Sequence, residues 1–354
     1  MENPENERVD ETTVLSKRQA IKQITDPLEK QKVLQATMQR LNDKYGDDLI
    51  MNDSAKKEMK IKALPSGILS LDLAMGIGGY PRGRLIEVFG AESSGKTTVA
   101  LHAVAQAQKL GGIAAYIDVE NSLDPDYAEN IGVNLDDLIF SQPDSGEKAF
   151  DALEELVKTG ALDIIVIDSV AALTPQAEID GVNLQAELAK MMSERLKRIV
   201  SLVNKTKTVV LFINQVRSNL SGFLGTGETT PGGKALKFYT SIRIEVKTSE
   251  KIKQGEMAIG KKTTLTTVKN KVASPFKKAL VDNIWGEGFA PALDIVTCAT
   301  KTDIVQQSGK WYSFEGQKIG NGIFEVKDYL KSHGQVMGAI EGTTREKLGL
   351  PKLR

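Results

Sequence analysis

The sequence has little of the residue types that several classes of protein require. Its single cysteine, Cys298, excludes an internal disulfide and a cysteine-rich metal site, as expected for a reducing compartment such as the cytoplasm. Its two histidines, His102 and His333, have no neighbouring cluster of ligating residues, so we interpret all three side chains as structural. No run of about 18 apolar residues occurs, and the polar start MENPENERVDETTV lacks the apolar core of a signal peptide. Membrane insertion and secretion are therefore not expected.

The chain also lacks an excess of charge of either sign. Lys and Arg together number 46, as do Asp and Glu, so the formal net charge is zero. A strongly basic total would have pointed to nucleic acid, and its absence means that any DNA binding must come from local basic or backbone-rich loops. The length of 354 residues allows one large core with small additions.

Short apolar runs alternate with helical patterns through the middle of the chain. The apolar runs cover residues 85–90, 113–118, 163–168 and 209–214, and helical spacing appears at 68–75, 97–110 and about 184–203. Continuous apolar strands separated by helices predict an α/β fold with a mostly parallel central sheet flanked by helices. The segments 241–247 and 263–271 are half polar and β-rich, which predicts an antiparallel extension of that sheet.

The composition also suggests how the chain is divided. Residues 1–26 are polar and predicted to be disordered, and residues 27–60 are predicted to form an N-terminal helix, ending near Gly46, and a linker. The apolar stripe of that helix needs a partner, either its own core or a neighbouring subunit. The main core is expected over 61–289, followed at 290–354 by a small α/β domain with a hairpin around WYSFEGQKIG.

The strongest motif is GAESSGKT at residues 90–97, which fits the P-loop pattern G-x-x-x-x-G-K-[ST]. It follows an apolar strand and opens a helix, so successive backbone N–H groups and the helix N-terminus can surround phosphate oxygens. Lys96 is expected at the β- and γ-phosphates and the Thr97 hydroxyl on Mg²⁺. The predicted ligands are ATP and Mg²⁺, held by Gly90, Ala91, Glu92, Ser93, Ser94, Gly95, Lys96 and Thr97.

Polar residues follow the other predicted strands. Asp168 ends the run 163–168 and resembles a Walker B carboxylate aimed at magnesium, although an acid there could instead cap a turn. Glu120, two residues past the run 113–118, is our candidate for orienting and polarising the attacking water, with Asp118 as its competitor. Gln215 follows 209–214 and can either hydrogen-bond a γ-phosphate or simply cap the strand end.

A glycine-rich segment without periodicity, residues 217–233, comes next. Loops of this length inside a compact domain are usually functional or disordered. If Gln215 senses the γ-phosphate, the loop is a switch that ATP orders, and Arg217 with backbone N–H groups can hold DNA phosphates. The alternative is a plain surface loop.

Several long segments together resemble the bacterial RecA family of P-loop ATPases. They are LPSGILSLDLAMGIGGYPRGRLIEVFGAESSGKTT, YIDVENSLDPDYA, IDSVAALTPQAEIDG, FINQVRS, ETTPGGKALKFY and VKNKVASPFK, in the family's order and spacing. The resemblance implies an ATP-dependent recombinase that forms a filament on single-stranded DNA and exchanges strands with double-stranded DNA. It also implies a filament that stimulates self-cleavage of an SOS repressor in the DNA-damage response.

The resemblance assigns further residues. Thr98 would join the phosphate site, Asp124 and Tyr127 would hold adenine, and Glu120 would activate water. Lys269 and Lys271 would act on the neighbouring subunit's ATP, and Trp285 and Gly286 would close over the base from the same side. The N-terminal helix would mediate polymerisation. Phe238 would pack at the same interface, and DNA loops at about 178–187 and 216–231 would include Arg217, Gly222, Gly232 and Gly233.

The chain departs from the family's pattern in places. The first DNA loop is short and lacks a Met-Gly pair, which puts its contacts in doubt. Asn121 stands where His is usual, and Leu224 where an aromatic residue is frequent. The ending REKLGLPKLR is not acidic, so restraint of DNA binding by an acidic tail is not expected. Two other functions were weighed: a nucleotide-switched signalling filament with weak strand exchange, and a hexameric helicase, which the N-terminal helix, the VKNK strand and the C-terminal domain disfavour.

Overall fold

The computed structural model describes residues 24–46, 61–175, 185–218, 228–229 and 231–353, and the chain divides into two units, residues 1–60 and 61–354. In the first unit, helix α2 (Pro27–Tyr45) begins where the Asp26 carboxylate accepts the N–H groups of Leu28 and Glu29, and ends at Gly46. The predicted helix is confirmed. Most of the stretch predicted to be disordered lies outside the described residues.

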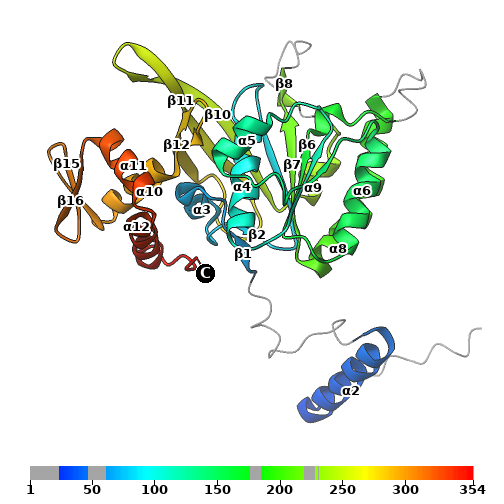
Figure 1. Cartoon of the computed structure of the whole chain (residues 1–354). Helices are drawn as coiled ribbons and strands as arrows, with labels where there is room; N and C mark the ends of the chain where they lie inside the picture. The colour runs from blue at the N-terminus through cyan, green and yellow to red at the C-terminus, as the bar shows by residue number, and fades with distance from the viewer. Residues whose placement is uncertain (1–23, 47–60, 176–184, 219–227, 230, 354) are drawn as a thin grey trace, which may run out of the picture. The chain divides into compact units, whose positions relative to one another are not determined.

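A nine-stranded sheet forms the centre of the second unit (Figure 1). Its strand order is β13-β12-β11-β10-β3-β7-β6-β4-β5, and the neighbours from β10 to β5 are all parallel. The predicted parallel sheet is therefore confirmed. The parallel strands are β3 (Leu85–Gly90), β4 (Ala114–Asp118), β5 (Ile139–Ser141), β6 (Ile164–Asp168), β7 (Val209–Gln215) and β10 (Ile242–Gln254).

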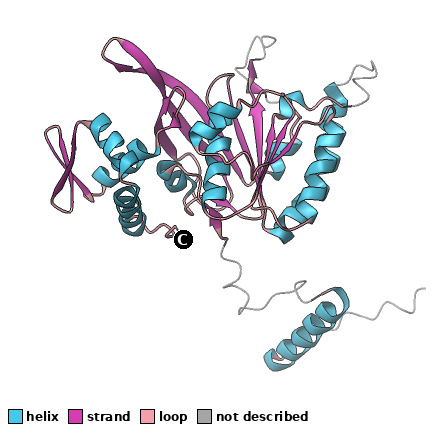
Figure 2. Cartoon of the chain, in the orientation of Figure 1, coloured by secondary structure: helices cyan, strands magenta, loops and turns pink. Residues whose placement is uncertain are grey.

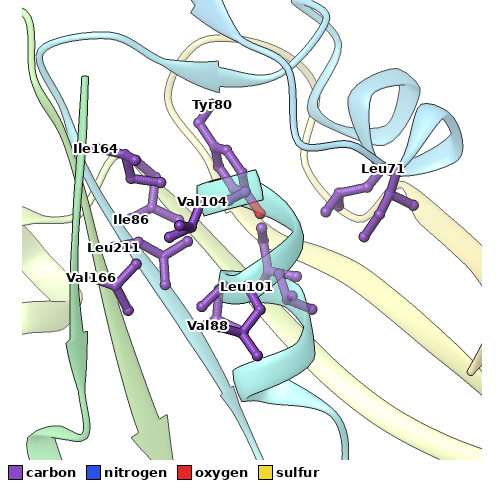
Figure 3. Packing of buried hydrophobic residues seen from close by; sticks show 14 of the residues in the cluster. Leu71, Tyr80, Ile86, Val88, Leu101, Val104, Ile164, Val166 and Leu211 are labelled. Atoms are coloured by element: carbon purple, nitrogen blue, oxygen red, sulfur yellow. The ribbon is translucent and has the colours of Figure 1, made fainter. Parts of the chain in front are cut away.

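Helices cover both faces of the parallel strands because alternate strand residues point to opposite sides. One core contains the even-numbered residues of β3 and β6 and is covered by α3 (Leu69–Met75), α4 (Lys96–Lys109) and α5 (Pro125–Ile131). Figure 3 shows Leu101 and Val104 of α4 against Ile86 and Val88 of β3. The other core lies under α6 (Gly146–Lys158), α8 (Gln185–Thr206) and α9 (Ala235–Tyr239).

The antiparallel extension begins one strand later than the sequence suggested. The segment 241–247 lies in β10, which is parallel to β3 on one side and antiparallel to β11 (Met257–Asn270) on the other. Strands β12 (Lys278–Ile284) and β13 (Gly288–Phe289) continue the antiparallel part. The far ends of β10 and β11 project as a two-stranded ribbon (Figure 2).

The C-terminal segment packs on this sheet within the same unit. It comprises α10 (Pro291–Lys301), a small sheet of β14 (Val305–Ser308), β15 (Trp311–Phe314) and β16 (Gln317–Asn321), then α11 (Ile323–Ser332) and α12 (Gly334–Lys347). The predicted hairpin around WYSFEGQKIG is the β15–β16 pair. Smaller elements are β1 (Ala63–Leu64), β2 (Tyr80–Pro81), η2 (Val170–Ala172), β8 (Arg217–Ser218) and β9 (Glu228–Thr229). None of the helices in the described ranges is long and apolar enough to cross a membrane.

Candidate nucleotide-binding site

The P-loop joins the end of β3 to the start of α4, and both of its motif glycines are required by geometry. Gly95 has φ +97°, in the left-handed region that favours glycine. At Gly90, an added Cβ would lie 2.4 Å from the Val246 carbonyl oxygen of the adjacent strand. The loop can therefore fold tightly only with glycine at these two positions.

Two P-loop side chains are placed as a phosphate group requires. Lys96 is 7% exposed, and its Nζ donates to the Ala91 carbonyl at 2.7 Å. Burial lowers the pKa of Lys96, and the nearby carboxylates of Asp168 and Glu120 oppose that shift. The buried Ser94 hydroxyl has no hydrogen-bond partner among the described residues. A buried cation and a free hydroxyl in this loop fit a phosphate.

Asp168 ends β6 beside the P-loop, as predicted. Its Oδ2 accepts hydrogen bonds from the Thr97 hydroxyl at 2.9 Å and the Tyr116 hydroxyl at 2.7 Å. Burial raises the pKa of Asp168 to about 6, against the lowering effect of these two hydroxyls. A hydroxyl and a carboxylate in contact supply the oxygen ligands that Mg²⁺ prefers, so the pair fits a magnesium ion held between protein and phosphates.

The two acids after β4 have different environments. Asp118 is 1% exposed and accepts the backbone N–H groups of Ser122 and Leu123 at 3.3 and 3.1 Å, so it shapes its own loop. Glu120 instead accepts from the Ser169 hydroxyl and from Gln215 Nε2, the latter at 2.8 Å. Glu120 is thus hydrogen-bonded to Gln215, whereas Asp118 stabilises the loop that follows β4.

A cavity of about 390 Å³ opens beside the P-loop. Tyr127 lines it and is fixed by a 2.8 Å hydrogen bond between its hydroxyl and that of Thr98. Asp124 caps α5 by accepting the Tyr127 N–H at 3.2 Å. Trp285 and Gly286 line this cavity in their own chain, together with the P-loop, whereas the resemblance had grouped them with Lys269 and Lys271. The lining residues are Ser93, Gly95, Lys96, Thr97, Thr98, Tyr127, Thr248, Lys261, Asn283, Trp285 and Gly286.

Comparison with known proteins identifies the family. Residues 32–290 match the RecA N-terminal domain and residues 293–349 the RecA C-terminal domain. "Protein RecA, plasmid" of Lactococcus lactis subsp. lactis is 59% identical over 328 residues, covering 93% of this chain and 96% of that protein. The chain belongs to the RecA family.

Other relatives agree. Protein RecA of Bacillus subtilis (strain 168) is 49% identical over 328 residues, covering 91% of this chain and 93% of that protein. Protein RecA of Enterococcus gallinarum is 49% identical over 323 residues, with coverages of 90% and 92%. The RadB recombinase crystal structure, with a TM-score of 0.49 and 23% identity over 64% of this chain and 98% of that one, is too distant to add to this. This RecA chain is accordingly a recombinase and a DNA-dependent ATPase that uses ATP with Mg²⁺.

The two lysines predicted to act on a neighbouring subunit's ATP do not line the RecA chain's own cavity. Lys269 Nζ donates to the Lys237 carbonyl at 2.5 Å, and Lys271 Nζ to the Phe238 carbonyl at 3.0 Å, so both lie at the C-terminal end of α9. Burial and the neighbouring cations Lys271 and Arg243 lower the pKa of Lys269 to about 8. Phe238 beside them is 70% exposed. The three residues predicted at the interface therefore share one surface.

The predicted DNA loops are described only in part. Strand β8, which contains Arg217, pairs antiparallel with β9 across the second loop, while Gly222 and most of the first loop, 178–187, lie outside the described residues. Gly232 and Gly233 have φ +83° and +71°, and a Cβ on either would lie 3.0 Å from Val170 or Ala189 respectively. These two glycines are needed for the backbone turn that ends the loop.

One buried network near the RecA site was not predicted. Glu87, fully buried in β3, accepts from Arg243 Nε at 2.5 Å and from Asn214 Nδ2 at 3.0 Å. The same amide of Asn214 donates to the Pro231 carbonyl at 3.3 Å, at the far end of the second loop. The signal in the sequence was a carboxylate inside the apolar run LIEVFG, since buried acids are rarely unpaired.

Proposed function

We propose that this RecA chain hydrolyses ATP at the interface between subunits of a filament on single-stranded DNA, and that it thereby pairs that strand with homologous double-stranded DNA and exchanges strands. The observation that carries the proposal is the hydrogen bond between Glu120 and Gln215. It joins the acid placed for hydrolysis to the residue at the end of β7, two positions before Arg217 at the start of the second DNA loop.

The phosphates would be held by the P-loop N–H groups, by Lys96 and by the Ser94 hydroxyl. When bound, Mg²⁺ supplies positive charge to the phosphate oxygens, with Thr97 and Asp168 as its protein ligands. Tyr127 and Trp285 supply aromatic surface to the cavity, against which a purine base would lie.

Glu120 would orient a water molecule and accept its proton as it attacks the γ-phosphate. The hydrogen bonds from Gln215 and Ser169 fix its carboxylate in the unliganded site. A γ-phosphate that took Gln215 as its own partner would release that carboxylate and shift the end of β7. Loss of the phosphate would restore the pair and relax the loop.

The second DNA loop would hold the DNA backbone through Arg217 and through N–H groups near Gly232 and Gly233. Contacts of this kind read no sequence, as pairing of any homologous strands requires. Such binding should weaken steeply with salt.

The neighbouring subunit would supply Lys269 and Lys271. Two cations brought to the γ-phosphate across an interface stabilise transition-state charge as an arginine finger does, which makes hydrolysis depend on assembly. Their position beside the exposed Phe238, outside their own chain's cavity, supports this assignment. Stimulation of SOS repressor self-cleavage and a cytoplasmic location rest on the family resemblance and, for the latter, on the single Cys298.

The test is ATP turnover measured with and without single-stranded DNA for the unsubstituted protein, Lys96→Ala, Lys269→Ala with Lys271→Ala, and a mixture of the two variants. We expect each variant alone to be inactive and the mixture to recover DNA-dependent turnover. Recovery follows because an intact P-loop of one variant can meet the intact lysines of the other. Turnover by Lys96→Ala would refute the phosphate site, and a mixture as inactive as its components would refute the shared site.

An assay of strand exchange distinguishes the recombinase from the alternative, a signalling filament. Strand exchange between labelled homologous DNAs is the expected result. A filament that forms and hydrolyses ATP but moves no strand would favour the signalling function.

A further inference from the structure

The wall of the nucleotide cavity that contains Trp285 and Gly286 is formed by residues 285–289, which comprise the turn 285–287 after β12 and the short strand β13; we call this segment the 285–289 turn. Few backbone hydrogen bonds join this segment to the rest of the chain. Strands β12 and β13 share the pairs Asn283–Phe289 and Ile284–Gly288, the Trp285 N–H donates to the Ile259 carbonyl at 3.0 Å, and the Glu287 N–H donates to the Ile284 carbonyl at 3.1 Å. Side-chain contacts therefore help to keep the segment in place, and Glu287 makes two of them by accepting from Lys331 Nζ at 2.7 Å and Lys327 Nζ at 3.2 Å.

His102 supplies such a contact from the P-loop helix. It lies in α4 and is 4% exposed, and its Nε2 accepts the backbone N–H of Phe289 at 3.0 Å. Its ring also stacks on the Phe289 ring, with centroids 5.6 Å apart and planes inclined by 22°. Because the hydrogen bond requires a free lone pair on Nε2, the imidazole is neutral; burial agrees, since it lowers the pKa of His102 to about 4.

The backbone of the turn packs closely against the His102 side chain. Gly288 has φ +76°, and a Cβ there would lie 2.9 Å from His102 Nε2 and 3.0 Å from Ile131 of α5. On the other side of the contact, the Phe289 ring approaches to 3.4 Å of where a Cβ on Gly95 would lie. The turn is thus seated between the P-loop, α4 and α5, the elements that form the rest of the cavity.

We propose that His102 is a positioning residue for nucleotide binding, which holds the 285–289 turn against the P-loop helix so that Trp285 and Gly286 close the cavity. This deepens the proposed function and rests on its assignment of the cavity to ATP. His102 is not among the residues that line the cavity, so it should affect how tightly nucleotide is held and not the rate of the chemical step.

The test uses fluorescence of Trp285 in the full chain with Trp311→Phe, which leaves Trp285 as the only tryptophan. ADP with Mg²⁺ is titrated into this protein and into its His102→Ala and His102→Gln variants. His102→Ala leaves a buried N–H unpaired, and we expect the ADP Kd to rise about tenfold. The Gln amide oxygen can accept the same N–H, so His102→Gln should remain close to the parent. His333→Ala, which changes the other and exposed histidine, is the matched control and should leave the Kd unchanged.

Turnover measured over a range of ATP concentrations gives a second measurement: His102→Ala should raise KM and keep kcat. Gly288→Ala, which crowds the same contact from the turn, should raise the ADP Kd even if His102→Ala does not fold. An ADP Kd that is unaffected in both His102→Ala and Gly288→Ala overturns the inference. Equal loss in His102→Ala and His102→Gln also overturns it. If Lys96→Ala abolishes turnover while His102→Ala changes nothing, the ATP site stands and only this inference fails.

Discussion

Replacing Asp72 with Asn should destabilise the 61–354 unit by about 3 kcal/mol, at the lower end of the cost of breaking a buried ion pair. Asp72 in α3 and Arg345 in α12 are 0% and 1% exposed, and Arg345 Nη2 donates to Asp72 Oδ2 at 2.5 Å. The substitution would leave the guanidinium buried without its main countercharge. Glu341 still accepts from Arg345 Nε at 2.8 Å, which is why the lower end of the range applies.

The assay is urea unfolding of the full chain for Asp72→Asn, Arg345→Met and the double variant. Asp72→Asn leaves Arg345 with Glu341 as its remaining acidic partner, and Arg345→Met leaves Asp72 without its countercharge, whereas the double variant removes both charges of the pair. The double variant should therefore be more stable than the sum of the single losses predicts. Lys148→Gln, which removes an exposed i,i+4 bridge to Asp144, is the control and should not change the midpoint measurably. Additive losses, or a loss for Asp72→Asn below about 1 kcal/mol, would show that the pair behaves like a surface bridge and would refute the reasoning.

The other predictions concern the nucleotide site. Glu120→Gln should keep ATP binding and slow hydrolysis by on the order of 10²-fold or more, as loss of a general base does. Asp118→Asn should instead lower mainly the stability of the fold. Equal loss of ATP binding and of turnover in Glu120→Gln would count against a role of Glu120 in hydrolysis. Burial lowers the pKa of the neutral His102 side chain to about 4. As the pH falls below about 6.5, His102 is therefore protonated in the unfolded chain before it is protonated in the folded one, and the free energy of unfolding decreases. Between pH 6.5 and 4, the free energy of unfolding of the unsubstituted protein should fall by up to about 3 kcal/mol more than that of His102→Gln, measured by urea unfolding at each pH. If the difference between the two proteins does not change with pH, His102 is not buried in its neutral form. The opposite slope from Asp294, whose pKa burial raises to about 6, is present in both proteins and cancels.

The sequence predicted the features that depend on neighbours along the chain. The P-loop needed only a strand, glycines at set positions and a helix start, and helix α2 only an apolar stripe at helical spacing and a Gly end. Glu120 could be preferred to Asp118 because two further residues take a side chain past the strand end to the edge of the sheet. Each of these inferences uses local geometry that sequence spacing determines.

The features that could not be predicted depend on contacts between distant segments. Glu87 and Asn214 are 127 residues apart, and Arg345 and Asp72 are 273 apart. The spacing of charges along a chain does not show which buried acid meets which base. The position of Trp285 beside the P-loop of its own chain could not be predicted for a related reason. A resemblance in sequence marks a residue as part of a site, but only the strand order places it in its own chain or in its neighbour.

The strand order also explains why hydrolysis can act on DNA at all. In the order β3-β7-β6-β4, four adjacent parallel strands end at the same edge, with the P-loop after β3, Gln215 at the end of β7, Asp168 at the end of β6 and Glu120 just past β4. Neighbouring strands lie about 5 Å apart, so Gln215 can reach Glu120 across the end of β6 without any rearrangement of the sheet. In the proposed mechanism, a change of hydrogen-bond partner at Gln215 would therefore displace the strand end from which the predicted second DNA loop starts. Because Asn214 ties the same strand end to the Pro231 carbonyl, both ends of that loop would respond to the state of one amide side chain.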